Sequence, residues 1–152
     1  MTNTITKTTH VKAPIDRVWR AISDHKEFGQ WFNVALDQPF QAGQTSTGKI
    51  THPGFEHCAW NAEIEAIEPT RRFALRWHPF AIDPDVDYSD ERTTLVEFLL
   101  EPEADGTRVT ITETGFDKLP EARREIALRS NTQGWAAQAN NLREYAEARA
   151  EA

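Results

Sequence analysis

The chain has 152 residues, of which 39% are hydrophobic and 27% are charged, and its formal net charge at pH 7 is −7. This length fits a single domain over residues 1–152, because two separate cores would each be very small. The acidic balance argues against a nucleic-acid-binding surface, which needs clustered Lys and Arg, and no apolar run approaches the roughly 20 residues of a membrane span. With one cysteine and no apolar leader sequence, we expect a cytoplasmic protein with no nucleic-acid or membrane partner.

The first elements are a strand and two short helices. Residues 4–12 alternate between apolar and polar side chains, which predicts a strand. Pro14 and Asp16 are typical of the start of a helix, because Pro suits the first turn and an acidic side chain favours the positive end of the helix dipole. Asp24 interrupts this helix and can cap a second one, which Gly29 is expected to close.

The middle of the chain, from residue 34 to residue 114, consists of strands and turns. Six further strands are predicted, at residues 34–36, 45–51, 60–68, 73–77, 94–101 and 107–114. The tetrapeptide Glu-Ala-Asp-Gly at residues 103–106 is a strong hairpin signal. The longest irregular segment, residues 78–92, contains two Pro and four Asp, and loops of this length often serve as lids or binding loops.

The last segment, residues 120–150, is rich in good helix formers. One apolar stripe on it comprises Leu128, Trp135, Ala139, Leu142 and Ala146. Gly134 costs about 1 kcal/mol relative to Ala inside a helix, and Ser130-Asn131-Thr132 favours helix ends. We therefore expect a kink or break near Asn131, with Asn131 as a cap and Gln138 at a solvated edge.

The order of these elements predicts an α+β fold. Hairpin connections dominate and no βαβ alternation occurs, so the sheet should be antiparallel with its helices on one face. We expect a helix-grip fold: a curved antiparallel sheet of about seven strands wrapped around a long C-terminal helix, with two short helices after strand one. A cleft between the sheet and the last helix is the expected place for a pocket, unless aromatic side chains fill it to the packing density of an ordinary core.

Glu113 breaks the apolar pattern of its strand. Alternation places Val109, Ile111 and Glu113 on the face that the helix covers, where a charge is costly. One interpretation is that Glu113 lies at a hydrated strand end or pairs with an Arg. The other is a pocket carboxylate that orients a ligand or holds a proton. If Glu113 is buried without a partner, Glu113→Gln should stabilise the protein near neutral pH.

The residues give no positive sign of a metal site or a catalytic centre. Residues 52–58, His-Pro-Gly-Phe-Glu-His-Cys, gather potential ligands, but zinc needs three or four in a tetrahedral array and this spacing matches no zinc pattern that we can name. Cys58 would need an activating base, and His57 should point the other way on an extended strand, so Cys58 should be a small buried apolar residue. The chain contains no nucleophile elbow, P-loop or dinucleotide-binding motif. We expect no catalytic residue, no metal and no cofactor.

Several stretches of the chain resemble a known superfamily. Residues 11–24, Val-Lys-Ala-Pro-Ile-Asp-Arg-Val-Trp-Arg-Ala-Ile-Ser-Asp, are followed by Phe28, Trp31 and Phe32. Later matching stretches are residues 67–73, 94–98 and 106–116, and then Gly134-Trp135 with Asn141-Leu142. Together and in this order they resemble the START-like (helix-grip, SRPBCC) superfamily. Within it, the chain is most similar to homologues of the C-terminal domain of the activator of the heat-shock-protein-ninety ATPase, over essentially its whole length.

The resemblance implies the helix-grip fold and a choice of functions. Members of the superfamily bind lipids, hormones, polyketides and other hydrophobic molecules, and some catalyse cyclisation or hydrolysis inside the cavity. The eukaryotic activator uses this domain as a co-chaperone beside a separate N-terminal domain, for which 152 residues leave no room. Fold similarity alone does not choose among these roles.

The function expected first is binding of a small hydrophobic or aromatic molecule between the sheet and the C-terminal helix. The alternatives are a cyclase- or hydrolase-type enzyme, with Glu113 as acid or base and His78 nearby, and a co-chaperone-like interaction domain. A homodimer and a chaperone partner stay open. The expected ligand-binding residues are Trp31, Phe32, Trp60, Phe73, Trp77, Phe98, Ile111, Glu113, Phe116, Leu128 and Trp135.

Overall fold

The computed structural model describes residues 3–83 and 85–150. It contains one antiparallel sheet of seven strands in the spatial order β1-β7-β6-β5-β4-β3-β2. The strands are β1 (Thr4–Val11), β2 (Val34–Leu36), β3 (Thr45–Ile50), β4 (Ala59–Glu68), β5 (Arg72–Trp77), β6 (Thr94–Glu103) and β7 (Gly106–Thr114). Apart from the β1–β7 pairing, all neighbours in the sheet are consecutive in sequence, so the sheet is built almost entirely from hairpins.

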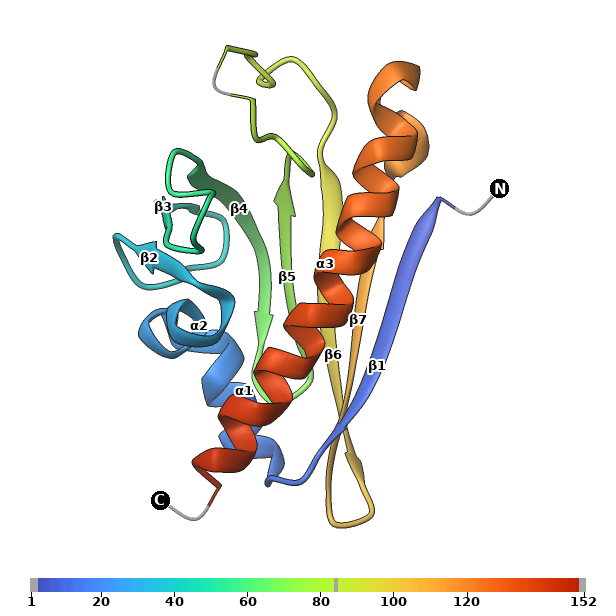
Figure 1. The fold of residues 1–152 in the computed structure, drawn as a ribbon. Helices are drawn as coiled ribbons and strands as arrows, with labels where there is room; N and C mark the ends of the chain where they lie inside the picture. The colour runs from blue at the N-terminus through green and yellow to red at the C-terminus, as the bar shows by residue number, and fades with distance from the viewer. Residues whose placement is uncertain (1–2, 84, 151–152) are drawn as a thin grey trace.

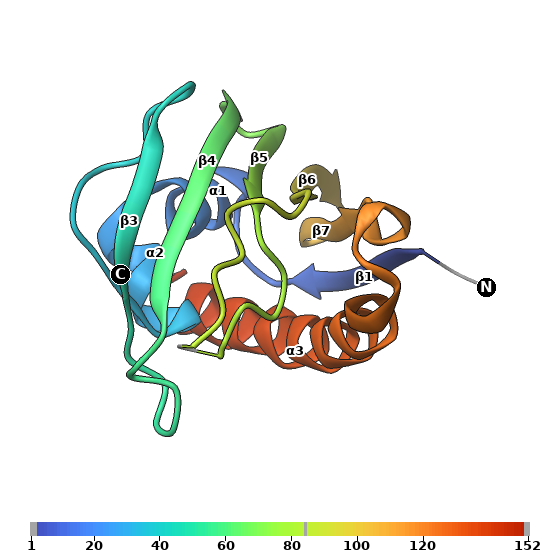
Figure 2. The ribbon, with the colours of Figure 1, turned by 90° about the horizontal axis from the view of Figure 1, so that it is seen from above.

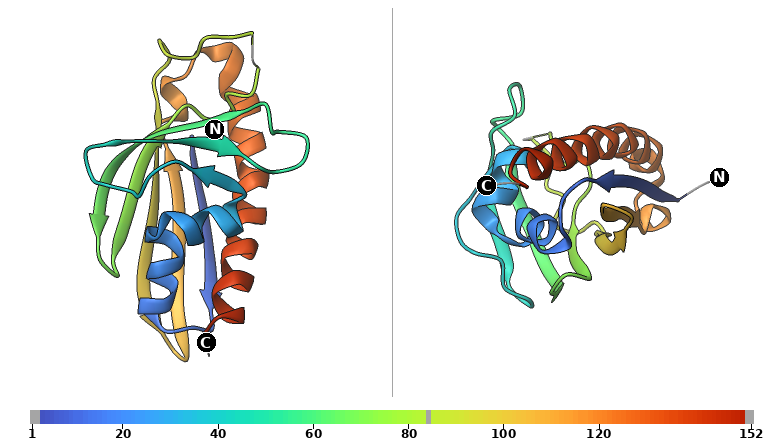
Figure 3. Two further views of the ribbon diagram at one scale, coloured as in Figure 1. Left: turned by 90° about the vertical axis from the view of Figure 1, so that its left-hand side faces the viewer. Right: turned by 90° about the horizontal axis from the view of Figure 1, so that it is seen from below.

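Three α-helices and one 3₁₀ turn accompany the sheet. They are α1 (Ile15–Ser23), α2 (His25–Phe32), η1 (Phe116–Lys118) and α3 (Glu121–Ala148). In the view from above, the strands form an arc whose concave side faces α3 (Figures 1 and 2). The short helices α1 and α2 lie beside the C-terminal half of α3 and close one end of this arc (Figure 3). The α+β helix-grip architecture predicted from the sequence is confirmed. No helix in the described ranges is long and apolar enough to cross a membrane.

The second helix begins as predicted but ends later. The Asp24 side chain accepts hydrogen bonds from the backbone amides of Lys26 and Glu27, which caps the N-terminus of α2. The predicted stop at Gly29 is wrong, because α2 continues to Phe32 and ends on Asn33 in the left-handed conformation (φ 68°). Gly29 instead allows a close approach, since a Cβ there would lie 2.3 Å from the carbonyl oxygen of Val34. The glycine therefore serves the α2–β2 turn and not a helix end.

The predicted break near Asn131 is also wrong, because α3 is one continuous helix of 28 residues. The polar side chains that favour helix ends find other partners here. The hydroxyl of Thr132 donates to the carbonyl oxygen of Leu128 (2.6 Å), and Asn131 and Gln138 reach into the interior of the fold. Gly134 is exposed, and a Cβ built on it meets no atom within 4 Å. Tertiary contacts have overridden the local preference for an interruption.

Replacing Gly134 with Ala should therefore stabilise the protein. The substitution removes backbone entropy from the unfolded chain and introduces no clash, which is worth about 1 kcal/mol in a helix interior. For a domain of this size the melting temperature should rise by about 2–4 °C. Differential scanning calorimetry of both proteins is the measurement. A melting temperature at or below that of the wild type would show that α3 is not a regular helix at this position.

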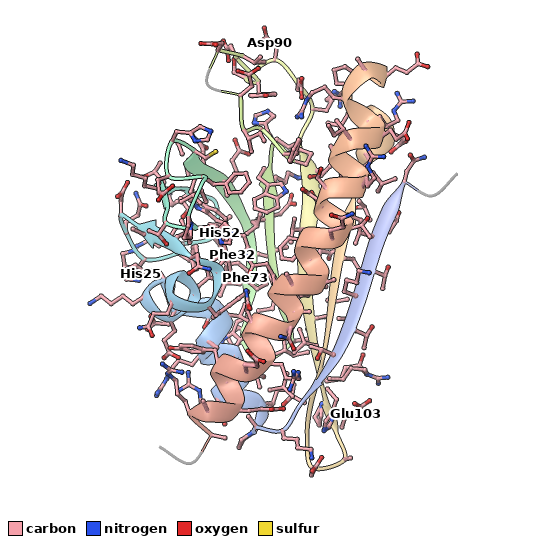
Figure 4. All side chains as sticks on the ribbon, viewed as in Figure 1. His25, Phe32, His52, Phe73, Asp90 and Glu103 are labelled. Atoms are coloured by element: carbon pink, nitrogen blue, oxygen red, sulfur yellow. The ribbon has the colours of Figure 1, made fainter. Side chains whose placement is uncertain are left out.

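His10 lies near the C-terminal end of β1, where the β6–β7 turn approaches this strand. His10 Nδ1 and Nε2 lie 2.9 Å from Glu103 Oε1 and Asp105 Oδ1 respectively. The hydrogen bond to Glu103, followed by that to Asp105, raises the pKa of His10 above its ordinary value of 6.5. Figure 4 labels Glu103 at this end of the molecule. The protonated imidazole can donate to both carboxylates at once, which holds the turn against β1.

This contact predicts a pH-dependent contribution to stability. Because the pKa of His10 is raised on folding, the contribution is complete below about pH 6.5 and is lost as the pH rises through the folded pKa. The difference in melting temperature between wild type and His10→Gln should therefore be larger at pH 6 than at pH 9. The matched control is His25→Gln, because His25 forms no ion pair within residues 3–83 and 85–150. A difference independent of pH would contradict the role given to His10.

Candidate functional site

Glu113 lies at the centre of a buried group of hydrogen-bond donors. Its Oε1 accepts from the indole nitrogen of Trp135 (2.8 Å) and from Asn131 Nδ2 (3.0 Å). Its Oε2 accepts from the indole nitrogen of Trp77 (2.8 Å) and from the hydroxyl of Thr94 (2.5 Å). The side chain is fully buried, with 0% exposure. No Lys, Arg or His forms an ion pair with it in the described part of the chain.

Four elements, β5, β6, β7 and α3, bring these groups together. Glu113 comes from β7 and pairs in register with Val96 of β6, which leaves Thr94 two residues along β6 on the same face. Trp77 is the last residue of β5, opposite Thr94. Asn131 and Trp135 are one turn apart on α3, so both project from the same side of that helix. The site thus ties the adjacent ends of β5, β6 and β7 to the middle of α3.

The arrangement suits an ionised carboxylate. A carboxylate is an acceptor only, with about four lone-pair positions, and the surrounding groups offer four donors. The condition under which Glu113→Gln was expected to stabilise the protein, burial without a partner, is therefore not met. The four bonds also leave neither oxygen open to a substrate, so the geometry favours a positioning role over general acid–base chemistry. His78 does not join this group; its Nε2 lies 3.0 Å from the carbonyl oxygen of Glu91.

The two indoles that Glu113 binds are part of a larger aromatic cluster. The rings of Trp77 and Trp135 stack at 5.7 Å with an interplanar angle of 29°. Phe32 packs against both, at 6.2 and 6.1 Å, and Trp60 lies 5.6 Å from Trp77. Deeper in the fold, Phe98 contacts Trp135 at 5.8 Å. These contacts occupy much of the space between the sheet and α3 in which the sequence predicted a cavity.

A first cleft of about 310 Å³ opens at the edge of this cluster, between α3 and the end of α2. Its apolar walls are Phe32, Trp77, Trp135, Gly134 and Ala137. Its polar groups are the side chains of Asn33, His52, Asn131, Gln138 and Asn141. Phe32 and His52, both labelled in Figure 4, lie near each other beside α3. The two stacked indoles, of which Trp135 is only 3% exposed, therefore line this cleft beside a set of amide groups and one imidazole.

A second cleft of about 520 Å³ lies on the other side of Trp77 and Asn131, beside the loop formed by residues 78–83 and 85–92. Trp60, Trp77, Ile50, Phe80 and Ile82 form its apolar part. Cys58, Asn61, His78, Tyr88 and Ser89 contribute polar atoms. In the view from above, this loop extends from β5 towards α3 (Figure 2).

The expected ligand-binding residues divide into three groups. Phe32, Trp60, Trp77 and Trp135 line one or both clefts. Glu113 lies behind the indoles and touches neither cleft. The other predicted residues line neither cleft: Phe73, Phe98, Ile111 and Phe116 are fully buried, Trp31 donates to the carbonyl oxygen of Ala21 (2.8 Å), and Leu128 packs against the core.

Reasoning from the sequence missed the polar rim of the first cleft. Asn131 was expected to cap a helix and Gln138 to be solvated, yet Asn131 binds Glu113 and Gln138 Nε2 donates to the carbonyl oxygen of Phe32 (3.1 Å). Asn141 in turn donates to Gln138 Oε1 (3.1 Å). The spacing of 131, 134, 138 and 141 by three and four residues is the signal that could have placed these residues on one helix face.

His57 and Cys58 are arranged differently from the expectation. The segment forms turns, not an extended strand, and Cys58 Sγ lies 3.5 Å from His57 Nε2. Both atoms face the carbonyl oxygen of Ile82, at 4.0 and 3.1 Å. Burial raises the pKa of the Cys58 thiol, which is the opposite of what an activated nucleophile needs. No group of three metal-competent side chains occurs among residues 3–83 and 85–150.

Several solved structures share the fold of this chain. DynU16, a protein in the dynemicin biosynthetic locus, superposes with a TM-score of 0.74 at 22% identity; the match covers 97% of this chain and 48% of DynU16, so this chain spans about half of that protein. CV1439 from Chromobacterium violaceum superposes with a TM-score of 0.73 at 20% identity, and the match covers 97% of this chain and 99% of CV1439. The Aha1 dimer from Colwellia psychrerythraea superposes with a TM-score of 0.70 at 16% identity, and the match covers 97% of each of the two chains compared.

The sequence comparison is more specific than these likenesses of fold. No curated protein matches the chain. The profile of the family described as "Activator of Hsp90 ATPase homolog 1-like protein" matches residues 12–147. This range contains every strand after β1, the whole Glu113 site and almost all of α3. The resemblance seen in the residues is thereby confirmed, and the chain belongs to the family of activator of Hsp90 ATPase homolog 1-like proteins.

Proposed function

We propose that this protein binds a small, flat aromatic molecule in the first cleft, against Trp77 and Trp135. The observation that carries the proposal is the four-donor site at Glu113, which fixes the two stacked indoles at the wall of the cleft. A preorganised aromatic surface binds a flat ligand at low cost, because no side chain has to be ordered on binding. The volume of about 310 Å³ falls at the lower end of the range for small-molecule sites.

The composition of the cleft supports the same ligand class. Apolar walls provide burial, and a few amide groups, on α3 and directly after α2, supply directional hydrogen bonds. One of the similar structures belongs to a biosynthetic locus, which agrees with a small-molecule role in this fold. The proposal extends the prediction made from the sequence, with the ligand at the edge of the aromatic cluster and not in the centre of the fold.

The test is a titration with a simple aromatic probe and a variant that fills the cleft. The probe is 2-naphthamide, and binding is measured by isothermal titration calorimetry. Gly134→Leu places a side chain in the first cleft without disturbing α3, because nothing lies within 4 Å of the added Cβ. This variant should weaken binding at least tenfold. Gln133→Leu, an exposed neighbour outside the cleft, should bind as the wild type does.

Two outcomes would contradict the proposal. Absence of saturable binding to the wild type is one, and equal weakening by Gly134→Leu and Gln133→Leu is the other. Circular dichroism of both variants confirms that α3 is retained, which separates loss of the site from loss of the fold.

A homodimer remains a second part of the proposal, since the similar protein from Colwellia psychrerythraea is described as a dimer. Sedimentation equilibrium of the purified chain over a hundredfold concentration range tests it. A mass that stays at one chain throughout would exclude self-association under those conditions.

A further inference from the structure

We propose that the two clefts form one bipartite site, which takes an elongated, uncharged molecule with two ring systems joined by a hydrogen-bond donor. This inference rests on the proposed function and extends it to the second cleft. Trp77 and Asn131 line both clefts and so form the boundary between them. A ligand that reaches from one cleft to the other must therefore pass these two side chains.

The charge of the surroundings selects against anions. None of the described residues that line either cleft is Lys, Arg, Asp or Glu. A carboxylate or phosphate buried there would find no Lys or Arg as a partner, which is costly, and only the imidazoles of His52 and His78 could offer it a positive charge. The loop over the second cleft adds exposed acidic side chains at Asp83, Asp85, Asp87 and Asp90, of which Asp90 is labelled in Figure 4. Their negative potential opposes the approach of an anionic ligand.

Asn131 determines what the middle of the ligand should carry. Its Nδ2 donates to Glu113, a carboxylate that only accepts, so the amide can have only one orientation. Its Oδ1 is left as an acceptor at the boundary of the two clefts, and no hydrogen bond from the described residues reaches it. A ligand with an N–H or O–H group at the junction can satisfy this oxygen. The orientation of Asn131 thus converts the buried charge of Glu113 into a preference for a neutral donor.

Each cleft offers an aromatic contact for one ring system. Trp77, Trp135 and Phe32 line the first cleft, and Trp60 and Phe80 accompany Trp77 in the second. The volumes of about 310 and 520 Å³ leave room for a ring system in each. A molecule confined to one cleft would leave the aromatic wall of the other cleft without a partner.

The test compares four probes by isothermal titration calorimetry. They are 2-naphthamide, its anionic analogue 2-naphthoate, the longer N-phenyl-2-naphthamide, and phenyl 2-naphthoate, an ester of the same length without the N–H. The longer amide should bind the wild type at least tenfold more tightly than 2-naphthamide. The ester should lose most of that gain, and 2-naphthoate should bind at least tenfold more weakly than the amide of the same shape.

Variants then assign the gain to the second cleft. Ala59 is exposed and lines only that cleft, so Ala59→Leu fills it. This variant should bind 2-naphthamide normally but lose the extra affinity for the longer amide. Gly134→Leu should weaken the binding of both probes, and Gln133→Leu should weaken the binding of neither.

The outcomes separate this inference from the proposed function. If 2-naphthamide binds but the longer amide gains nothing, or if its gain survives in Ala59→Leu, the bipartite site is refuted while binding in the first cleft stands. If 2-naphthoate binds as tightly as 2-naphthamide, the preference for an uncharged ligand is refuted. If none of the probes binds, the proposed function and this inference both fail.

Discussion

Replacing Glu113 with Gln should lower the melting temperature by about 5–10 °C, which corresponds to roughly 2–3 kcal/mol for a domain of this size. The carboxylate accepts four hydrogen bonds, and bonds to a charged group are worth about 1.5–3 kcal/mol each before the cost of burial is set against them. Gln presents an NH₂ group at one end. Whichever way it is turned, that group faces an N–H donor, from Trp77 on one side or from Trp135 and Asn131 on the other.

The matched control for this change is Glu63→Gln, a substitution at an exposed position of β4. It removes the same charge from the protein, so a general effect of net charge would appear in both variants. Thermal unfolding followed by circular dichroism at pH 7 measures the difference. An unchanged or higher melting temperature for Glu113→Gln would mean that the cost of burying the charge outweighs its four hydrogen bonds.

The same variant links stability to the proposed function. Glu113 does not line either cleft, so its substitution leaves the cleft surface chemically unchanged. If Glu113 holds the indoles of Trp77 and Trp135 in place, 2-naphthamide should nevertheless bind Glu113→Gln more weakly, measured at a temperature where the variant is folded. Retained affinity would limit Glu113 to a structural role.

The sequence carries most of the information about the fold. Strand alternation, the hairpin signal at residues 103–106 and the absence of βαβ units together predict the antiparallel sheet and its long final helix, and the structure agrees. Alternation alone also aims Glu113 and Trp77 at the helix-covered face, where both lie. These features depend on the period of side chains along a strand, which a single sequence shows directly.

The site itself depends on contacts between distant parts of the chain, which a single sequence does not show. Trp77 lies 36 residues and Trp135 lies 22 residues from Glu113, and no local pattern states that their indole nitrogens share one carboxylate. The local costs at Asn131 and Gly134 argued for a break in α3, because Asn favours caps until a buried acceptor one turn from Trp135 offers it a better partner. The residues that break a local rule here are those that bind Glu113 or line the first cleft.

Arg123 at the start of α3 is the second residue with a large expected effect, because it holds the loop over the second cleft. Its guanidinium donates to both carboxylate oxygens of Glu91 (3.0–3.2 Å) and to the carbonyl oxygens of Pro79 (2.8 Å) and Phe80 (3.0 Å). It also lies 4.6 Å from the centre of the Tyr88 ring. Phe80 has a positive φ of 51°, a strained conformation for a bulky residue that persists only where its surroundings hold it.

Arg123→Gln should therefore release this loop while leaving the fold intact. The Arg123 and Glu91 side chains are only 17% and 16% exposed, so the lost hydrogen bonds to charged groups are little screened and are worth about 1.5–3 kcal/mol of local stability. Amide hydrogen exchange in residues 80–92 should speed up about ten- to hundredfold, whereas exchange in β6 and β7 should change little. Arg129→Gln, at an exposed position on the same helix, is the control.

Because the loop forms one wall of the second cleft, Arg123→Gln should also remove the extra affinity for N-phenyl-2-naphthamide and leave the affinity for 2-naphthamide unchanged. Faster exchange without that loss of affinity would show that the loop covers the second cleft but takes no part in binding.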